Sequence, residues 1–126
     1  MKGKVLLVDD TEFYLKAYKM KLVADGYEVG TAANGVEAIK AVATDRPDII
    51  LLDLMMPVMD GFKVLQVIKD DPNLNQIPVV VFSAKGNTDE VVKAMSAGAT
   101  DFLVKATTTP NKVVEKIHQI INKKKA

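Results

Sequence analysis

The chain has 126 residues, of which 48% are hydrophobic and 26% charged, and its 17 basic and 16 acidic side chains leave a net charge of +1. This composition predicts one globular domain, residues 1–126, and excludes a disordered chain. The balanced charge favours neither direct nucleic-acid binding nor a membrane surface. There is no cysteine, which excludes disulfides and thiolate chemistry, and no apolar run has the length of a membrane span. A cytoplasmic protein is therefore expected.

The first part of the chain alternates two predicted strands with two helical segments. The continuously apolar run Val5–Val8 is typical of a parallel strand covered on both faces, and Val29–Thr31 predicts a second strand. Gly26 stands where the helix between them should end. Asn34 then begins a second helix with a capping-box spacing. The apolar positions of that helix, before Pro47, are Val36, Ile39 and Val42.

The middle of the chain repeats this pattern. Ile49–Leu52 and Val79–Phe82 are again continuously apolar and predict two buried strands. Pro57 and Gly61 predict a turn into the helix between these strands. Two methionines before that helix, Met56 and Met59, are expected to be partly exposed at a partner surface. The apolar positions of the helix, which ends before Pro72, are Val64, Leu65 and Ile68.

The last part of the chain adds a helix, a strand and a final helix. Asn87 has capping-box spacing with Glu90, and Gly98 stands where that helix should end. Phe102–Val104 predicts the fifth strand. The pair Thr109-Pro110 predicts the N-cap and first residue of the final helix. The apolar stripe of this helix is Val113, Val114, Ile117, Ile120 and Ile121.

Strands that alternate with helices in this way predict an α/β fold. Such a chain forms a parallel sheet with helices on both faces and right-handed crossovers. Ligands of these sheets bind outside the carboxyl ends of the strands, near the point where the strand order reverses. The residues that directly follow the strands are therefore the first candidates for a functional site.

Charged and hydroxyl side chains stand at four of these strand ends. Asp9 and Asp10 follow the first strand, Asp53 follows the third, Ser83 follows the fourth and Lys105 follows the fifth. Taken alone, each has an ordinary explanation: Asp10 could cap a helix, and Lys105 could be an exposed lysine. Three carboxylates brought together would repel each other without a cation. Mg²⁺ suits such a site because it binds carboxylates, carbonyls and water.

The same residues can carry phosphoryl chemistry. Asp53 is a candidate nucleophile, since a carboxylate can form an aspartyl phosphate. Ser83 could donate a hydrogen bond to a phosphoryl oxygen, and Lys105 could pair with another. The backbone carbonyl of Met55 is a candidate magnesium ligand, which would explain why its side chain need not be polar.

The segments that contain these residues resemble response-regulator receiver domains, the phosphoacceptor modules of two-component signalling. They are VLLVDD at the first strand, DIILLDLMMPVMDG at the third, VVVFSA at the fourth and GATDFLVKA around the fifth. The resemblance covers essentially the whole chain. It implies a flavodoxin-like, doubly wound sheet of five parallel strands in the order 2-1-3-4-5, flanked by five helices.

The resemblance also implies partners and roles. Asp53 would accept a phosphoryl group from a sensor histidine kinase or a histidine phosphotransfer protein, and the domain would catalyse only its own phosphorylation and dephosphorylation. Ser83 and Lys105 would contact the phosphoryl group, and Phe102 would be the switch residue. The output face, comprising helix 4, strand 5 and helix 5, would bind an unidentified protein target. The implied Mg²⁺ ligands are Asp9, Asp10, Asp53 and the Met55 carbonyl.

Two positions depart from the family pattern. Ala106 follows the lysine where proline is common, so the loop to Thr109 is expected to be all-trans or differently shaped, because a non-proline cis bond costs roughly 3–4 kcal/mol. Phe102 occupies the switch position where tyrosine or histidine is frequent. It has no hydroxyl and can act only through packing. Both departures affect output and leave the phosphorylation chemistry untouched.

The sequence disfavours three other functions. A receiver-like interaction module that works without phosphorylation would normally lack one of the acids, the hydroxyl or the lysine, and all are present. An aspartate-nucleophile phosphatase would place a second aspartate at position 55, and Met55 has no proton to transfer. A flavin-binding domain would need a phosphate-binding loop after the first strand, where Asp9 and Asp10 would repel the phosphate.

Overall fold

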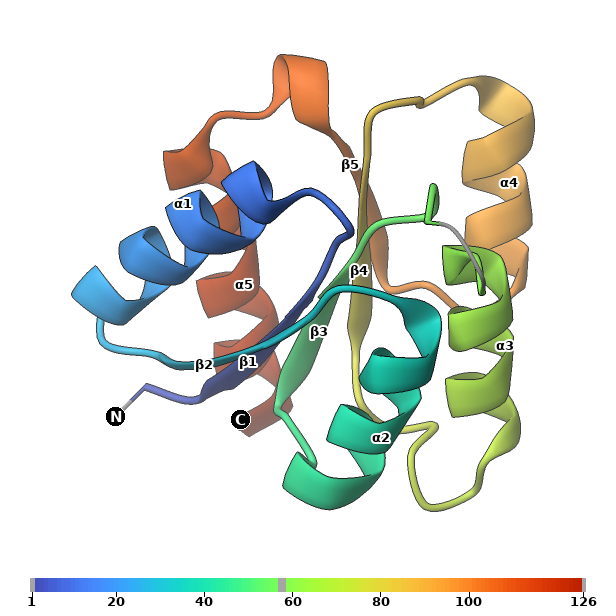
Figure 1. Ribbon diagram of the computed structural model, residues 1–126, viewed down its shortest axis with the longest axis horizontal. Coiled ribbons are helices and arrows are strands. Elements are labelled where there is room, and N and C mark those ends of the chain that lie inside the picture. Colours follow the sequence, from blue (N-terminus) through green and yellow to red (C-terminus); the bar gives the residue numbers. More distant parts are fainter. Residues whose placement is uncertain (1, 57–58, 126) are drawn as a thin grey trace.

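The chain forms a five-stranded parallel sheet between two layers of helices (Figure 1). The structure is a computed structural model and describes residues 2–56 and 59–125. The strands pair in the order β2-β1-β3-β4-β5, which confirms the doubly wound topology. Each strand begins and ends within one residue of its predicted bounds. The strands are β1 (Lys4–Val8), β2 (Glu28–Ala32), β3 (Ile49–Leu52), β4 (Val79–Ser83) and β5 (Asp101–Val104).

The helices cover the two faces of the sheet unequally. Helices α1 and α5 lie on one face, and α2, α3 and α4 lie on the other (Figure 1). A short 3-10 helix, η1, joins β5 to α5. The bounds are α1 (Glu12–Ala24), α2 (Gly35–Asp45), α3 (Gly61–Asp70), α4 (Thr88–Ser96), η1 (Lys105–Thr107) and α5 (Pro110–Lys125).

Alternate residues of the central strands fill two separate cores. In β1, Leu6 and Val8 face the α2–α3–α4 layer, whereas Val5 and Leu7 face the α1–α5 layer. All four side chains are at most 3% exposed. Burial on both faces explains why these strands are continuously apolar, because a strand between two helical layers has no solvent side.

The predicted helix ends are confirmed by their hydrogen bonds and dihedral angles. The Asn34 side chain accepts a hydrogen bond from the Glu37 amide at 2.9 Å, and that of Asn87 accepts one from the Glu90 amide at 2.9 Å. The Thr109 hydroxyl accepts a hydrogen bond at 3.2 Å from the amide three residues later. Gly26 and Gly98, which follow α1 and α4, have φ angles of +97° and +106°. Glycine adopts such positive φ angles without strain because it has no Cβ atom, whereas other residues do not. The predicted N-terminal caps of α2, α4 and α5 are thus confirmed.

The loop between β3 and α3 was predicted less well. Met56 is only 8% exposed and belongs to the core of the α2–α3–α4 layer, so the expectation that it is exposed at a partner surface was wrong. Met59 is partly exposed, as expected, and packs against the same core, whereas Pro57 lies outside the described residues. Asp60 caps α3 by accepting a hydrogen bond from the Lys63 amide at 2.9 Å, which the sequence analysis missed.

In the part of the chain that the structure describes, no helix combines the length and apolar character needed to cross a membrane.

Candidate functional site

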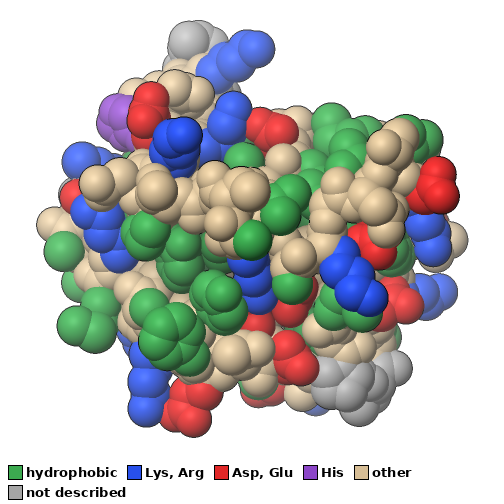
Figure 2. All heavy atoms as spheres, turned by 90° about the horizontal axis from the view of Figure 1, so that it is seen from above, with side chains coloured by type: hydrophobic (Ala, Val, Ile, Leu, Met, Phe, Trp, Pro, Cys, Tyr) green, Lys and Arg blue, Asp and Glu red, His purple; other side chains and the backbone are tan. Residues whose placement is uncertain are grey.

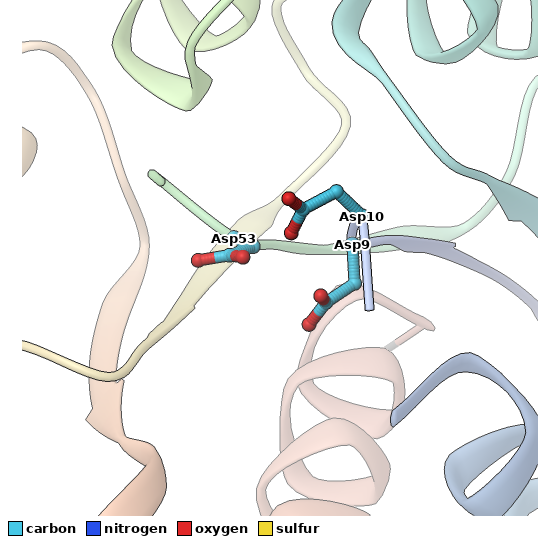
Figure 3. Close-up of side chains that lie close together, drawn as sticks. All are labelled: Asp9, Asp10 and Asp53. Carbon is cyan, nitrogen blue, oxygen red and sulfur yellow. The ribbon is translucent and has the colours of Figure 1, made fainter. Parts of the chain in front are cut away.

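The strand-end residues meet at the edge of the sheet where the strand order reverses. Chain connections leave β1 and β3 in opposite directions across the sheet, which places this point between the two strands. The carboxyl groups of Asp9, Asp10 and Asp53 surround a shared space there (Figure 3). Seen from above, acidic and basic side chains lie next to each other near the middle of this face (Figure 2). The structure thus brings together acids that follow two different strands, β1 and β3.

Backbone pairing holds two of the acids side by side. The Asp53 amide donates a hydrogen bond to the Val8 carbonyl at 2.9 Å, and the Asp9 amide donates one to the Ala32 carbonyl at 3.1 Å. Both bonds continue the sheet pairing one residue beyond the strands. Asp9 and Asp53 are 5% and 4% exposed, whereas Asp10 is exposed. The sheet therefore fixes two buried carboxylates, and the third approaches from the solvent side.

Local hydrogen bonds orient the buried carboxylates. Oδ1 of Asp9 accepts a hydrogen bond from the Thr11 amide at 2.9 Å, and Oδ1 of Asp53 accepts one from the Met55 amide at 3.2 Å. Thr11 is the N-cap residue of α1, so the suggestion that Asp10 caps this helix does not hold. In each acid, Oδ2 faces the lysine described next.

Lys105 is buried against the acids. Its Nζ donates a hydrogen bond to Oδ2 of Asp9 at 2.7 Å and lies 3.6 Å from Oδ2 of Asp53. Only 7% of the lysine side chain is exposed. A buried ammonium is costly unless it is paired, so this lysine belongs to the cluster and is not an exposed strand-end residue.

Burial raises the pKa of Asp53 from 3.8 to about 6. The negative charges of Asp9 and Asp10 add to this increase, and the Met55 amide and Lys105 oppose it. Desolvation disfavours the charged form, and nearby like charges do the same. The carboxylate is therefore still ionised at neutral pH but is held at a free-energy cost, as expected for a reactive group.

Ser83 is the last residue of β4, and Phe102 lies within β5. Ser83 is fully buried, and its Oγ accepts a hydrogen bond from the Lys85 amide at 3.3 Å. The hydroxyl proton is not used in that bond. Phe102 is partly buried against the core of the α2–α3–α4 layer. The roles of both residues stay predictions.

The loop after Lys105 agrees with the expectation for a chain without proline at this position. Ala106 lies in η1, and no peptide bond within residues 2–56 and 59–125 is cis. The chain thus passes from β5 to α5 through a single 3-10 turn, as the all-trans expectation allows.

Two residues of the site were missed. The Tyr14 ring lies below the Lys105 ammonium, with 4.0 Å between Nζ and the ring centroid. Gly61 packs directly on the backbone of Asp53 and Leu54. Glycine after Asp60 could have signalled a close approach, but it was interpreted as a turn residue. No pattern in the sequence distinguishes Tyr14 from Phe13 beside it.

The fold and this strand-end cluster define a flavodoxin-like α/β domain with an acidic site at its switch point. The response regulator receiver domain family matches the chain over residues 5–118. The chain therefore belongs to this family, whose members are the receiver domains of two-component signalling.

Individual relatives agree with this assignment. The chain is 38% identical to the chemotaxis protein CheY of Thermotoga maritima over 122 residues, which are 95% of this chain and 98% of that protein. It is 46% identical to the response regulator PleD of Caulobacter vibrioides over 105 residues, 83% of this chain. The chain spans only 23% of the length of PleD and 43% of that of the transcriptional regulatory protein PrrA of Mycobacterium tuberculosis.

Solved structures share the fold. The chemotaxis protein CheY4 of Vibrio cholerae superposes with a TM-score of 0.87 at 30% identity, over 94% of this chain and 98% of that one. The receiver domain of Francisella response regulator 1452 gives a TM-score of 0.89 at 25% identity, over 97% and 98% of the two chains.

Proposed function

We propose that this receiver domain accepts a phosphoryl group on Asp53 from a phosphohistidine of a sensor histidine kinase or a histidine phosphotransfer protein. The observation that carries the proposal is a buried carboxylate with a raised pKa, in contact with a buried lysine at the switch point of the sheet. A carboxylate oxygen of Asp53 forms a bond to phosphorus and the nitrogen–phosphorus bond breaks. The imidazole nitrogen keeps the electron pair, and the ring takes up a proton.

The chain's own groups support this step. Asp53 has a pKa of about 6 and is ionised at neutral pH, as a nucleophile must be. Lys105 lies 3.6 Å from Oδ2 of Asp53, near enough for its ammonium to pair with a phosphoryl oxygen. The Ser83 hydroxyl can donate to another, and each hydrogen bond to a charged group contributes about 1.5–3 kcal/mol. Chemistry of this kind depends on positioning and electrostatics.

The donor set fits Mg²⁺. Asp9, Asp10 and Asp53 each offer a carboxylate oxygen, and these oxygens lie within 4.8 Å of one another. The Lys105 ammonium pairs with two of these three acids, and its one positive charge does not neutralise three carboxylates. We propose that these acids and the Met55 carbonyl hold the ion. Bound Mg²⁺ would supply the positive charge that draws the phosphoryl oxygens toward the carboxylates.

Magnesium should stabilise the fold through these acids. At a concentration ten times its dissociation constant, Mg²⁺ should raise the free energy of unfolding by about 1.4 kcal/mol. Asp10→Asn should lose most of this gain and should unfold like wild type without the ion, because Asp10 is exposed. Urea unfolding monitored by circular dichroism gives the free energy of unfolding of each protein with and without Mg²⁺. Sodium chloride at the same ionic strength is the control. An equal gain in Asp10→Asn and wild type would contradict the assignment.

We further propose that phosphorylation alters the face formed by α4, β5 and α5. The phosphoryl group adds about −1.5 to −2 charges at neutral pH, and Ser83 and Phe102 would rearrange in response. A nearly complete shift of population needs about 5.5 kcal/mol, more than one hydrogen bond provides. Lys105 and the packing of Phe102 must contribute. Val92 and Met95 of α4 are 58% and 43% exposed, which favours a protein target on this face.

The domain is proposed to act only on itself, catalysing its own phosphorylation and dephosphorylation, without direct binding of nucleic acid or membrane. A cytoplasmic location is part of the same proposal. The alternative, an interaction module that works without phosphorylation, is disfavoured because the acids, the hydroxyl and the lysine are all in place at one edge of the sheet.

The phosphoacceptor assignment has a direct test. Wild type incubated with acetyl phosphate and Mg²⁺ should gain the mass of one phosphoryl group, measured on the intact protein. Asp53→Asn should gain none, because an amide is not a nucleophile of this kind. Asp70→Asn, at an exposed position at the end of α3, is the matched control and should behave like wild type. Wild type without a mass gain would favour the interaction module.

A further inference from the structure

The Lys105 ammonium has an aromatic partner in addition to its acidic partners. Its Nζ lies 2.7 Å from Oδ2 of Asp9 and 4.0 Å from the centroid of the Tyr14 ring. The Phe82 ring is farther away, with its centroid at 5.7 Å. A cation within about 6 Å of an aromatic centroid is attracted by the negative face of the ring, and the attraction increases when water is excluded. The lysine thus contacts both carboxylates and a ring.

Contacts with other aromatic side chains fix the orientation of the Tyr14 ring. It packs edge-to-face against Phe82, with centroids 6.1 Å apart and an interplanar angle of 87°. It also meets Phe13 edge-to-face at 5.5 Å and lies nearly parallel to Tyr18 at 6.3 Å. Phe82 belongs to β4, whereas the other three residues belong to α1. The ring face below the ammonium is therefore set by packing between a helix and the sheet.

The Tyr14 ring differs from the acidic partners of the lysine because it carries no net charge. Asp9 and Asp53 are also candidate ligands of Mg²⁺ and would share their oxygens with that ion. Tyr14 has no such competing role. A neutral ring face holds the ammonium equally before and after the carboxylates take other partners, without adding to the negative charge of the cluster.

We infer that Tyr14 is a positioning residue whose ring face holds the Lys105 ammonium beside Asp53 for phosphoryl transfer. The inference rests on the proposed function in that Lys105 is taken to contact the phosphoryl group. Its physical content is preorganisation: an ammonium already in place need not be ordered during the reaction. The hydroxyl of Tyr14 has no part in it, since the contact is with the ring.

Substitutions at Tyr14 should separate the ring face from side-chain bulk. With acetyl phosphate and Mg²⁺, Tyr14→Leu should be phosphorylated about tenfold more slowly than wild type, which corresponds to about 1.4 kcal/mol. Tyr14→Phe keeps the ring and should stay within about twofold of wild type. Phe62→Leu is the matched control, because its ring lies 4.1 Å from the ammonium of another lysine, Lys93, and it should not change the rate. A Tyr14→Leu rate within twofold of wild type, or a Tyr14→Phe rate as slow as that of Tyr14→Leu, overturns the inference.

A fluorinated ring gives a second test that leaves the packing unchanged. Trifluorophenylalanine at position 14 keeps the shape of phenylalanine and weakens the negative ring face, so it should be slower than Tyr14→Phe. Equal rates for the two rings contradict a cation–π contact.

A spectroscopic measurement tests the contact without phosphorylation. The Lys105 side-chain ε-methylene proton resonances of the unphosphorylated protein should be shifted upfield by the ring current, with and without Mg²⁺. This shift should persist in Tyr14→Phe and disappear in Tyr14→Leu, and its absence from wild type overturns the inference. Loss of phosphorylation in wild type with the shift intact would instead count against the proposed function alone.

Discussion

At pH 7.5 and without divalent cations, Asp53→Asn should raise the free energy of unfolding by about 1–3 kcal/mol. The wild-type carboxylate is ionised at this pH although its pKa is raised from 3.8 to about 6, mainly by burial. A pKa increase of about two corresponds to about 3 kcal/mol, and the lower figure allows for partial screening by solvent. Asparagine removes this charge and keeps a side-chain oxygen that can accept the hydrogen bond from the Met55 amide.

The same effect should depend on pH in a defined direction. Because the folded-state pKa is raised, the folded protein favours the neutral form of Asp53. Below pH 3.8 the acid is neutral in both the folded and unfolded states and costs no stability; as the pH rises from 3.8 through about 6, its ionisation lowers the free energy of unfolding. The advantage of Asp53→Asn should therefore fall at pH 4.5 to about a third of its value at pH 7.5. Urea unfolding at both values measures it, with Asp70→Asn expected to stay within about 0.5 kcal/mol of wild type. A variant less stable than wild type at pH 7.5, or a difference independent of pH, would refute the argument.

This prediction links stability to function. The carboxylate that is proposed to accept the phosphoryl group is one that the fold would hold more easily as a neutral group. Active sites often contain such destabilised groups, and their replacement stabilises a protein while removing its activity. Asp53→Asn should therefore be the more stable protein and the one that cannot be phosphorylated.

Gly61→Ala should lower the free energy of unfolding by about 1–3 kcal/mol. A Cβ atom at Gly61 would lie 2.6 Å from Cα of Leu54 and still closer to the carbonyl oxygen of Asp53. Both neighbours are backbone atoms of the loop that carries the phosphoacceptor. Replacing a helical glycine with alanine ordinarily raises the free energy of unfolding by about 0.5–1 kcal/mol. At Gly61 the close approach of the backbone should reverse the sign of this effect.

The matched control is another glycine with room for a methyl group. At Gly30, in β2, an added Cβ would have its nearest neighbour at 3.6 Å, in the Leu6 side chain, which is ordinary contact. Gly30→Ala should leave stability within about 0.5 kcal/mol of wild type. Urea unfolding of both variants measures the difference, and Gly61→Ala should also be phosphorylated more slowly because Asp53 must move. Equal stability of Gly61→Ala and Gly30→Ala would contradict the packing argument.

The strands and helices could be predicted from the sequence because hydrophobic pattern and helix capping depend on residues within each element. Two-sided burial makes β1, β3 and β4 continuously apolar, and Asn34 and Asn87 cap helices through bonds three residues away. Met56 shows where such rules fail. Its place in a loop suggested exposure, but the loop folds back and buries the side chain in the core.

The sequence alone determined the order of strands and helices and, through the chemistry at the strand ends, which residues form the acidic cluster. Alternating parallel strands and helices bring their carboxyl ends to one edge, so Asp9 and Asp53 had to meet. Only the tertiary structure decided how side chains from distant segments face one another. The burial of Lys105 against Asp9, the Tyr14 ring below its ammonium and the contact of Gly61 with Asp53 all depend on the distance and rotation between packed elements. These quantities arise from packing across the core and are not encoded in any local spacing.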